Sequence, residues 1–138
     1  MRTGVLICQD DNFTDLSRGL SREKAVLVGV PTLDWRSVAR EHFLNSRFRA
    51  IESRYAIMRS ADGGISAIVS AKGLVLASVN HLEKGTRVIV ADVPLENGGS
   101  WFGVWGHGLM LLISVALLLA SIVWRSAAVP QNQQLQST

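Results

Sequence analysis

Cysteine, proline and charged residues are scarce in this chain of 138 residues. The single Cys excludes a disulfide framework and any zinc site that needs two Cys ligands. Three Pro and 12 Gly show no period, which excludes a collagen-like or low-complexity chain. Charged residues make up 18% and hydrophobic residues 48%, the reverse of the balance in disordered chains. The composition predicts a folded chain of about one domain.

Clusters of basic or metal-binding residues are also lacking. Acidic and basic side chains nearly balance, with a net charge of +3, and no Lys/Arg cluster is interleaved with aromatic residues. The three His have no metal-ligand spacing. We therefore expect no nucleic-acid partner, no metal and no cofactor.

One long uncharged run stands near the end of the chain. Gly108–Trp124 would form a helix of about 25 Å, close to the ~30 Å of a bilayer's hydrocarbon core. Trp101 and Trp105 before the run and Trp124 at its end match the aromatic belts of membrane interfaces. A buried core helix is the alternative, but such helices rarely stay apolar on every side. The run predicts a transmembrane helix.

The flanking charges predict an orientation and a domain organisation. Residues 88–107 contain no Lys or Arg, whereas Arg125 follows the apolar run directly. The positive-inside rule then places the first hundred residues outside and the C-terminus in the cytoplasm. We expect a folded domain over residues 1–96, a linker and interfacial segment over 97–107, a transmembrane helix over 108–124, and a polar cytoplasmic tail over 125–138.

The first part of the chain has a mixed α/β pattern. Two short apolar runs, Thr3–Cys8 and Ala25–Val30, predict buried strands, and Pro31 would end the second. A helix through about Leu20, capped by Thr14 or Asp11, would join them. The strand–helix–strand order predicts a parallel pair with a right-handed crossover.

A longer helix is predicted over Arg36–Ser53, with Asp34 as its N-cap. Between its two apolar stripes lie three arginines spaced by seven residues: Arg40, Arg47 and Arg54. Either this row pairs with carboxylates, or the arginines extend into solvent. His42, at the rim of the helix, is interpreted as a surface or packing residue.

The following segment is rich in predicted strands. Tyr55–Ser60 predicts a strand that leads into a turn at Asp62–Gly64. Ile65–Ser70 and Leu74–Val79 flank a three-residue loop and predict a hairpin. Thr86–Ala91 predicts one more strand.

Cys8 is the strongest candidate for a chemical role. It follows a predicted strand and precedes a turn and a helix. Unpaired backbone N–H groups and the helix dipole at such a position favour the nucleophilic thiolate. The alternative is a free Cys that simply packs in the interior.

The residues around Cys8 support the first interpretation. The string Gly4–Leu16 resembles the nucleophile segment of the carbon–nitrogen hydrolase (nitrilase) superfamily, where an apolar strand leads into Cys-Tyr-Asp/Glu and an Arg-Phe-Pro-Glu-Leu turn. Five further strings resemble later family segments in the same order: Val28–Trp35, Phe48–Glu52, Arg59–Ser66, Gly73–Ala77 and Ala91–Pro94.

The resemblance implies a fold and a set of site residues. It implies an α/β fold that forms the C-terminal half of a four-layer α-β-β-α nitrilase-like domain, followed by the transmembrane helix. It also implies Cys8 as the nucleophile, with Gln9, Asp10, Asp62 and Gly64 in support.

A terminal membrane helix makes the chain similar to the apolipoprotein N-acyltransferase family. That likeness implies thiol acyl transfer from a phospholipid donor to the N-terminal amine of a lipoprotein acceptor, at the bacterial cytoplasmic membrane. The family uses a Glu base and a Lys oxyanion stabiliser, both well upstream of the nucleophile.

Departures from the family pattern leave a second interpretation open. Only seven residues precede Cys8, so the upstream Glu and Lys are missing, and Gln9 replaces the usual Tyr. We expect the C-terminal portion of a longer enzyme, truncated or with its start assigned late and inactive by itself, to which a second chain could supply the missing half. The alternative is a non-catalytic, membrane-tethered remnant or partner-dependent subunit. Thiol reactivity would distinguish the two.

Overall fold

The chain divides into two compact units, Met1–Trp105 and Gly106–Thr138. The computed structural model describes residues 1–81, 87–96 and 98–127. The first unit contains a sheet and its covering helices, and the second contains one long helix, α4 (His107–Ala127).

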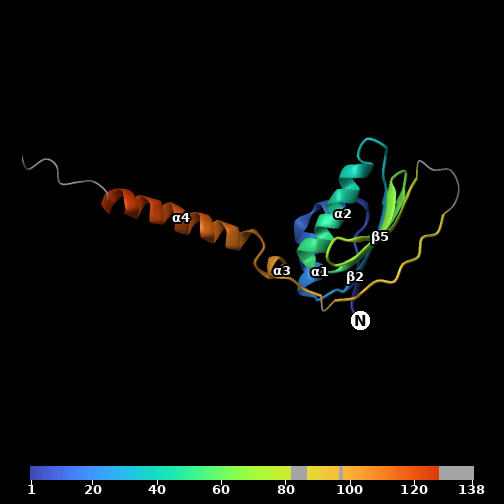
Figure 1. The fold of residues 1–138 in the computed structure, drawn as a ribbon, viewed down its shortest axis with the longest axis horizontal. Helices are drawn as coiled ribbons and strands as arrows, with labels where there is room; N and C mark the ends of the chain where they lie inside the picture. Colours follow the sequence, from blue (N-terminus) through green and yellow to red (C-terminus); the bar gives the residue numbers. More distant parts are fainter. Residues whose placement is uncertain (82–86, 97, 128–138) are drawn as a thin grey trace, which may run out of the picture. The chain divides into compact units, whose positions relative to one another are not determined.

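A five-stranded sheet organises the first unit (Figure 1). Its strands lie side by side in chain order: β1 (Thr3–Val5), β2 (Leu27–Leu33), β3 (Ala56–Asp62), β4 (Ile65–Val69) and β5 (Val75–Asn80). The first three strands are parallel, and β4 and β5 add to them in antiparallel fashion. The predicted parallel pair and the predicted hairpin are both confirmed.

The helices that connect the parallel strands lie together on one side of the sheet (Figure 1). They are the short 3-10 helix η1 (Cys8–Asn12), α1 (Thr14–Arg22) and α2 (Ala39–Ser53). A further short helix, α3 (Trp101–Trp105), packs on α1, where Gly103 lies against Ser21. The last helix of the first unit therefore falls in the segment that the sequence assigned to the linker.

The strand register separates a covered face from an open face. One row of aligned residues faces the helices and forms much of the core: Gly4, Val28, Ile57 and Val69. The next row points to the other side, where Val5 is 61% exposed and Met58 47%. Each fully buried Val or Ile contributes about 1.5–3 kcal/mol, so the covered face dominates the stability of the unit.

Pro31 lies inside β2 and does not end it, contrary to the prediction. The backbone oxygen of Gly29 accepts from the N–H of Leu6, so the backbone groups of Gly29 point toward β1. Residues two apart in a strand point to the same side, and the ladder with β1 ends at Gly29. Pro31 therefore lacks an N–H where no strand is paired, and the sheet loses no hydrogen bond.

The predicted helix caps are wrong. Helix α2 begins at Ala39, after Val38 in the N-cap position, and Asp34 is buried elsewhere. Helix α1 begins at Thr14, with Phe13 in the N-cap position and no capping side chain. Backbone hydrogen bonds of the preceding turns therefore start both helices, because the polar side chains nearby are engaged in tertiary contacts.

Part of the predicted last strand is absent as a strand. Residues 87–91 are not in a strand, and Thr86 lies outside the described residues. The tail beyond residue 127 also lies outside them.

Helix α4 contains the apolar run. Its segment His107–Arg125 has a mean hydropathy of 2.2, and its side chains are not buried within the structure. By length and composition it is the one described helix that could cross a membrane.

Candidate active site

Cys8 occupies a strained backbone position at the end of the sheet. It is the first residue of η1, and its φ of +53° lies in the left-handed region that non-glycine residues avoid. The side chain is half-buried, and its Sγ lies 4.0 Å from the backbone oxygen of Leu33 at the end of β2. Strain of this kind persists only where the surroundings hold it, and it concentrates at functional sites.

The turn that carries Cys8 is held by its own side chains. The Oδ2 of Asp10 accepts the backbone N–H of Ile7 at 2.9 Å, and the N–H of Asp10 donates back to the oxygen of Ile7. Asn12 accepts from the amide of Asn45 on α2 at 2.8 Å. Gln9 is exposed. Asp10 thus fixes the turn around Cys8, while the Gln9 side chain is open to solvent.

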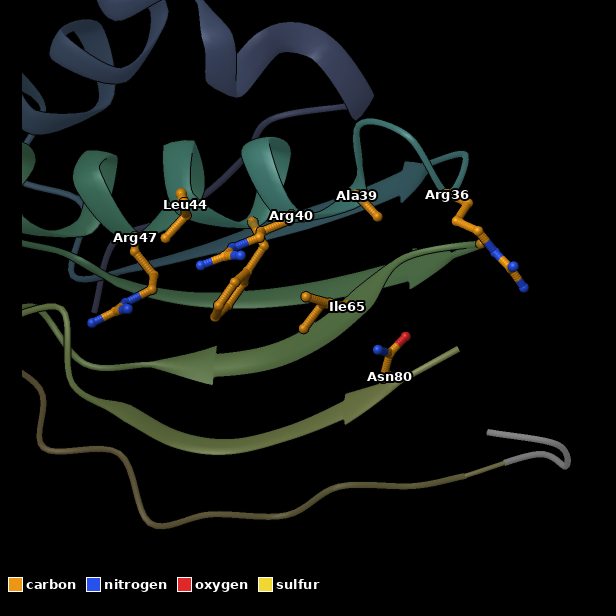
Figure 2. Close-up of a pocket in the computed structure, with 9 residues that line it drawn as sticks. Arg36, Ala39, Arg40, Leu44, Arg47, Ile65 and Asn80 are labelled. Carbon is orange, nitrogen blue, oxygen red and sulfur yellow. The ribbon is translucent and has the colours of Figure 1, made fainter. Parts of the chain in front are cut away.

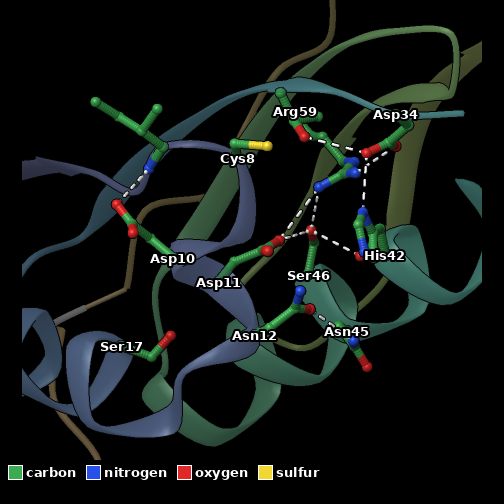
Figure 3. A network of polar contacts seen from close by, with 12 residues as sticks. Cys8, Asp10, Asp11, Asn12, Ser17, Asp34, His42, Asn45, Ser46 and Arg59 are labelled. Atoms are coloured by element: carbon green, nitrogen blue, oxygen red, sulfur yellow. Dashed lines mark hydrogen bonds and ion pairs between the residues drawn. The ribbon is translucent and has the colours of Figure 1, made fainter. Parts of the chain in front are cut away.

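A buried polar network centred on Arg59 lies next to this turn (Figure 3). Arg59 stands on the helix-facing side of β3 and is 2% exposed. Its Nη1 donates to Oδ2 of Asp11 at 3.2 Å, and its Nη2 donates to Oδ2 of Asp34 at 2.6 Å. One guanidinium therefore ties the turn after Cys8 to the loop after β2.

Helix α2 completes the network with two side chains. The hydroxyl of Ser46 donates to Asp11 and accepts from Arg59 at 2.8 Å. His42 Nδ1 lies 3.0 Å from Oδ1 of Asp34. His42 is only 8% exposed, so it packs inside the molecule, one of the two roles that the sequence left open.

The two carboxylates of the network titrate in opposite directions. Burial raises the pKa of Asp11 above 3.8 and outweighs its contacts with Ser46 and Arg59. Burial also acts to raise the pKa of Asp34, but hydrogen bonds from His42 and Arg59 more than offset it and hold that pKa below 3.8. Asp34 is therefore ionised at neutral pH and accepts from its neighbours, which places a proton on His42 Nδ1.

The turn Asp62–Gly64 packs on the same loop. The backbone N–H of Asp34 donates to the oxygen of Asp62 at 2.7 Å, and Gly63 has a φ of +77°. A Cβ on Gly64 would lie 2.9 Å from Cγ of Asp34, so only glycine fits there. The carboxylate of Asp62 is exposed and 3.3 Å from Nδ1 of His81.

The predicted site residues share one edge of the sheet. Cys8 follows β1, Asp34 follows β2, and Asp62 ends β3, so all three stand at carboxyl ends of parallel strands. Ligands of open parallel sheets bind at this edge. Within residues 1–81, 87–96 and 98–127, no group of three His, Cys, Asp or Glu could hold a metal ion.

The sequence missed the network itself: Asp11, Asp34, His42, Ser46 and Arg59. One signal was available. Arg59 lies two residues after Ile57, so both point to the same side of the predicted strand. A cation on the buried side of a strand requires carboxylate partners, and the nearby acids could have been examined for that role.

The family model for carbon–nitrogen hydrolases matches residues 1–102. The chain belongs to the carbon–nitrogen hydrolase family. Among solved structures it is similar to a Saccharomyces cerevisiae protein of branch 10 of the nitrilase superfamily, with a TM-score of 0.54 and 23% identity over 57% of this chain and 33% of that one. That likeness supports the fold.

Curated relatives of this carbon–nitrogen hydrolase chain are named apolipoprotein N-acyltransferase. The Bdellovibrio bacteriovorus relative is 30% identical over 135 residues, which cover 92% of this chain and 24% of that protein. The Shewanella oneidensis relative is 32% identical over 85 residues, which cover 62% of this chain and 16% of that protein. The chain thus spans about a quarter or less of the length of these relatives.

Proposed function

We propose that this chain is the C-terminal portion of a membrane-bound thiol acyltransferase of the carbon–nitrogen hydrolase family, with Cys8 as its nucleophile. The observation that carries the proposal is the half-buried thiol on a strained turn, backed by the Arg59 network. The relatives named apolipoprotein N-acyltransferase support a phospholipid donor and a lipoprotein acceptor.

The chemistry proceeds in two covalent steps. The Cys8 thiolate attacks an ester carbonyl of a phospholipid, a C–S bond forms, and the C–O bond breaks. The lysophospholipid alkoxide takes up the proton removed from the thiol. The N-terminal amine of the lipoprotein then attacks the thioester carbonyl, a C–N bond forms, the C–S bond breaks, and the amine proton leaves through a base.

The base and the oxyanion stabiliser would come from outside this chain. In the family that the chain resembles, a Glu and a Lys upstream of the nucleophile do this work. The exposed apolar row on the open sheet face, which includes Val5 and Met58, supports a second sheet packed there to complete a four-layer domain. That layer would bring the Glu and the Lys to Cys8, from the same polypeptide or from a second chain.

Helix α4 would cross the bacterial cytoplasmic membrane with the folded unit outside and Arg125 on the cytoplasmic side. Cys8 is the only thiol in the chain, so it reports this orientation directly. A membrane-impermeant maleimide should label it in intact spheroplasts. Labelling that requires permeabilised cells would contradict the orientation and would leave the catalytic proposal standing.

Acyl labelling tests the function. Native membranes that contain the full chain are supplied with a phospholipid whose acyl chain bears an alkyne. The chain should acquire a label that hydroxylamine removes, because thioesters are cleaved by that reagent, and Cys8→Ser should abolish it. Asp15→Asn, an exposed acid of α1, is the matched control and should keep the label.

Two outcomes would contradict the proposal. One is a label that persists in Cys8→Ser, since the acyl group would then sit elsewhere. The other is no label together with a Cys8 thiol that iodoacetamide modifies no faster at neutral pH than it modifies the unfolded chain. That second result would favour a non-catalytic, membrane-tethered subunit.

A further inference from the structure

A basic pocket lies between α2 and the β4–β5 hairpin, away from the residues that surround Cys8 (Figure 2). Its volume is about 420 Å³. Arginine and apolar side chains line most of it: Arg36, Arg40, Arg47, Phe43, Leu44 and Ile65. In Figure 2 the side chain of Arg40 turns along α2 toward Arg47, above Ile65, and Arg36 stands at the opposite end.

The arginine row of α2 divides into paired and open members. Arg54, its last member, lies 3.9 Å from a carboxylate oxygen of Glu96. Arg47 is fixed differently, because its Nε and Nη2 both donate to the backbone oxygen of Gly73, at 3.2 and 3.1 Å. Its guanidinium also stands 6.0 Å from the ring centre of Phe43. Arg47 is therefore held in place without a counter-charge.

Arg36 and Arg40 leave positive charge at the pocket. They are four residues apart at the start of α2, and both are exposed. Like charges at this spacing destabilise a helix by a few tenths of a kcal/mol. Among the described residues that line the pocket, none is Asp or Glu. Three guanidinium groups over an apolar floor thus create a concave site with a positive field, which raises the local concentration of anions.

We propose that this pocket binds a phosphate ester that carries a short apolar group. Guanidinium forks match the oxygens of phosphate in bidentate geometry, and Arg47 is already positioned for one such contact. Phe43, Leu44 and Ile65 supply a wall for the hydrocarbon part. The volume falls in the range of small-molecule sites. The inference does not rest on the acyl-transfer proposal, because no step of it involves Cys8.

Calorimetry on the full chain in nanodiscs of neutral phosphatidylcholine tests the site. The probes are hexyl phosphate, inorganic phosphate and hexanol. Hexyl phosphate should bind saturably, about tenfold more tightly than inorganic phosphate, because the apolar wall adds to the charge contacts. Hexanol should not bind measurably at about 10 mM, where a site with a Kd near 1 mM would be largely filled.

Substitutions assign the binding to this pocket. Arg40→Gln should weaken hexyl phosphate by about tenfold, the usual loss for one charge-assisted contact. Arg36→Gln should act in the same direction. Arg2→Gln removes an exposed arginine elsewhere on the surface and should change nothing. Leu44→Gln should weaken hexyl phosphate and leave inorganic phosphate unchanged.

The source of the phosphate ester is distinguished by the bilayer. If a lipid head group fills the pocket, phosphatidylglycerol in the nanodisc should compete with hexyl phosphate in the wild type and not in Arg40→Gln. If affinity is the same in both bilayers, the ligand is a soluble ester. The proposal fails if hexyl phosphate shows no saturable binding, if hexanol binds equally well, or if Arg40→Gln and Arg2→Gln give the same affinity.

Discussion

Replacing Arg59 by Met would leave two buried carboxylates without their shared cation. The guanidinium contacts Asp11 at 3.2 Å and Asp34 at 2.6 Å, and the side chains of all three residues are at most 1% exposed. Removing one partner of a buried ion pair costs about 3–5 kcal/mol. A unit of this size has a total stability of about 5–15 kcal/mol, so the loss would take a large part of it.

The cost of Arg59→Met should depend on pH. Without the cation, the pKa values of Asp11 and Asp34 rise in the folded state, since burial then acts unopposed by Arg59. An acid whose folded pKa is raised contributes stability that is lost as pH rises through that pKa. The difference between wild type and variant should therefore be largest near pH 7 and shrink toward about pH 4.5.

Hydrogen exchange followed by mass spectrometry against urea concentration is the assay. It reads peptides from β2 and β3 separately from α4, which detergent keeps helical. Arg2→Met is the matched control, because the Arg2–Glu23 pair is 67% and 78% exposed and such pairs contribute about 0–1 kcal/mol. The reasoning is refuted if Arg59→Met costs no more than Arg2→Met, or if its cost is the same at both pH values.

Two further variants probe the same edge of the sheet by the same assay. Gly64→Ala should destabilise by about 1–3 kcal/mol, because the added Cβ meets Asp34, whereas Gly19→Ala in α1 meets nothing within 4 Å and should stabilise by about 0.5–1 kcal/mol. Equal effects would contradict the close packing of the turn. The lowered pKa of Asp34 means that its stabilisation is present above about pH 4 and is lost as pH falls below 3.8. Asp34→Asn should be less stable at pH 7 and should lack that part of the acid-induced loss; an unchanged acid profile would contradict the assigned shift.

Local patterns in the sequence determined the elements of the fold. Apolar runs gave the parallel strands, Gly73 gave the hairpin loop with its φ of +77°, and the uncharged run gave α4. The position of Cys8 after a strand, together with the strings around it, identified the family before any geometry was known. Such features depend on neighbours in the chain, so the chain order alone is enough to predict them.

Tertiary structure decided the partners of the polar side chains. Asp34 looked like a helix cap because it precedes an apolar helical pattern, yet it is buried 25 positions before its partner Arg59. Parallel pairing brings their two strand ends together, and the low dielectric of the interior makes the pair more favourable than a cap. Contacts between residues so distant in the chain are set by strand order and register, which local sequence patterns do not specify.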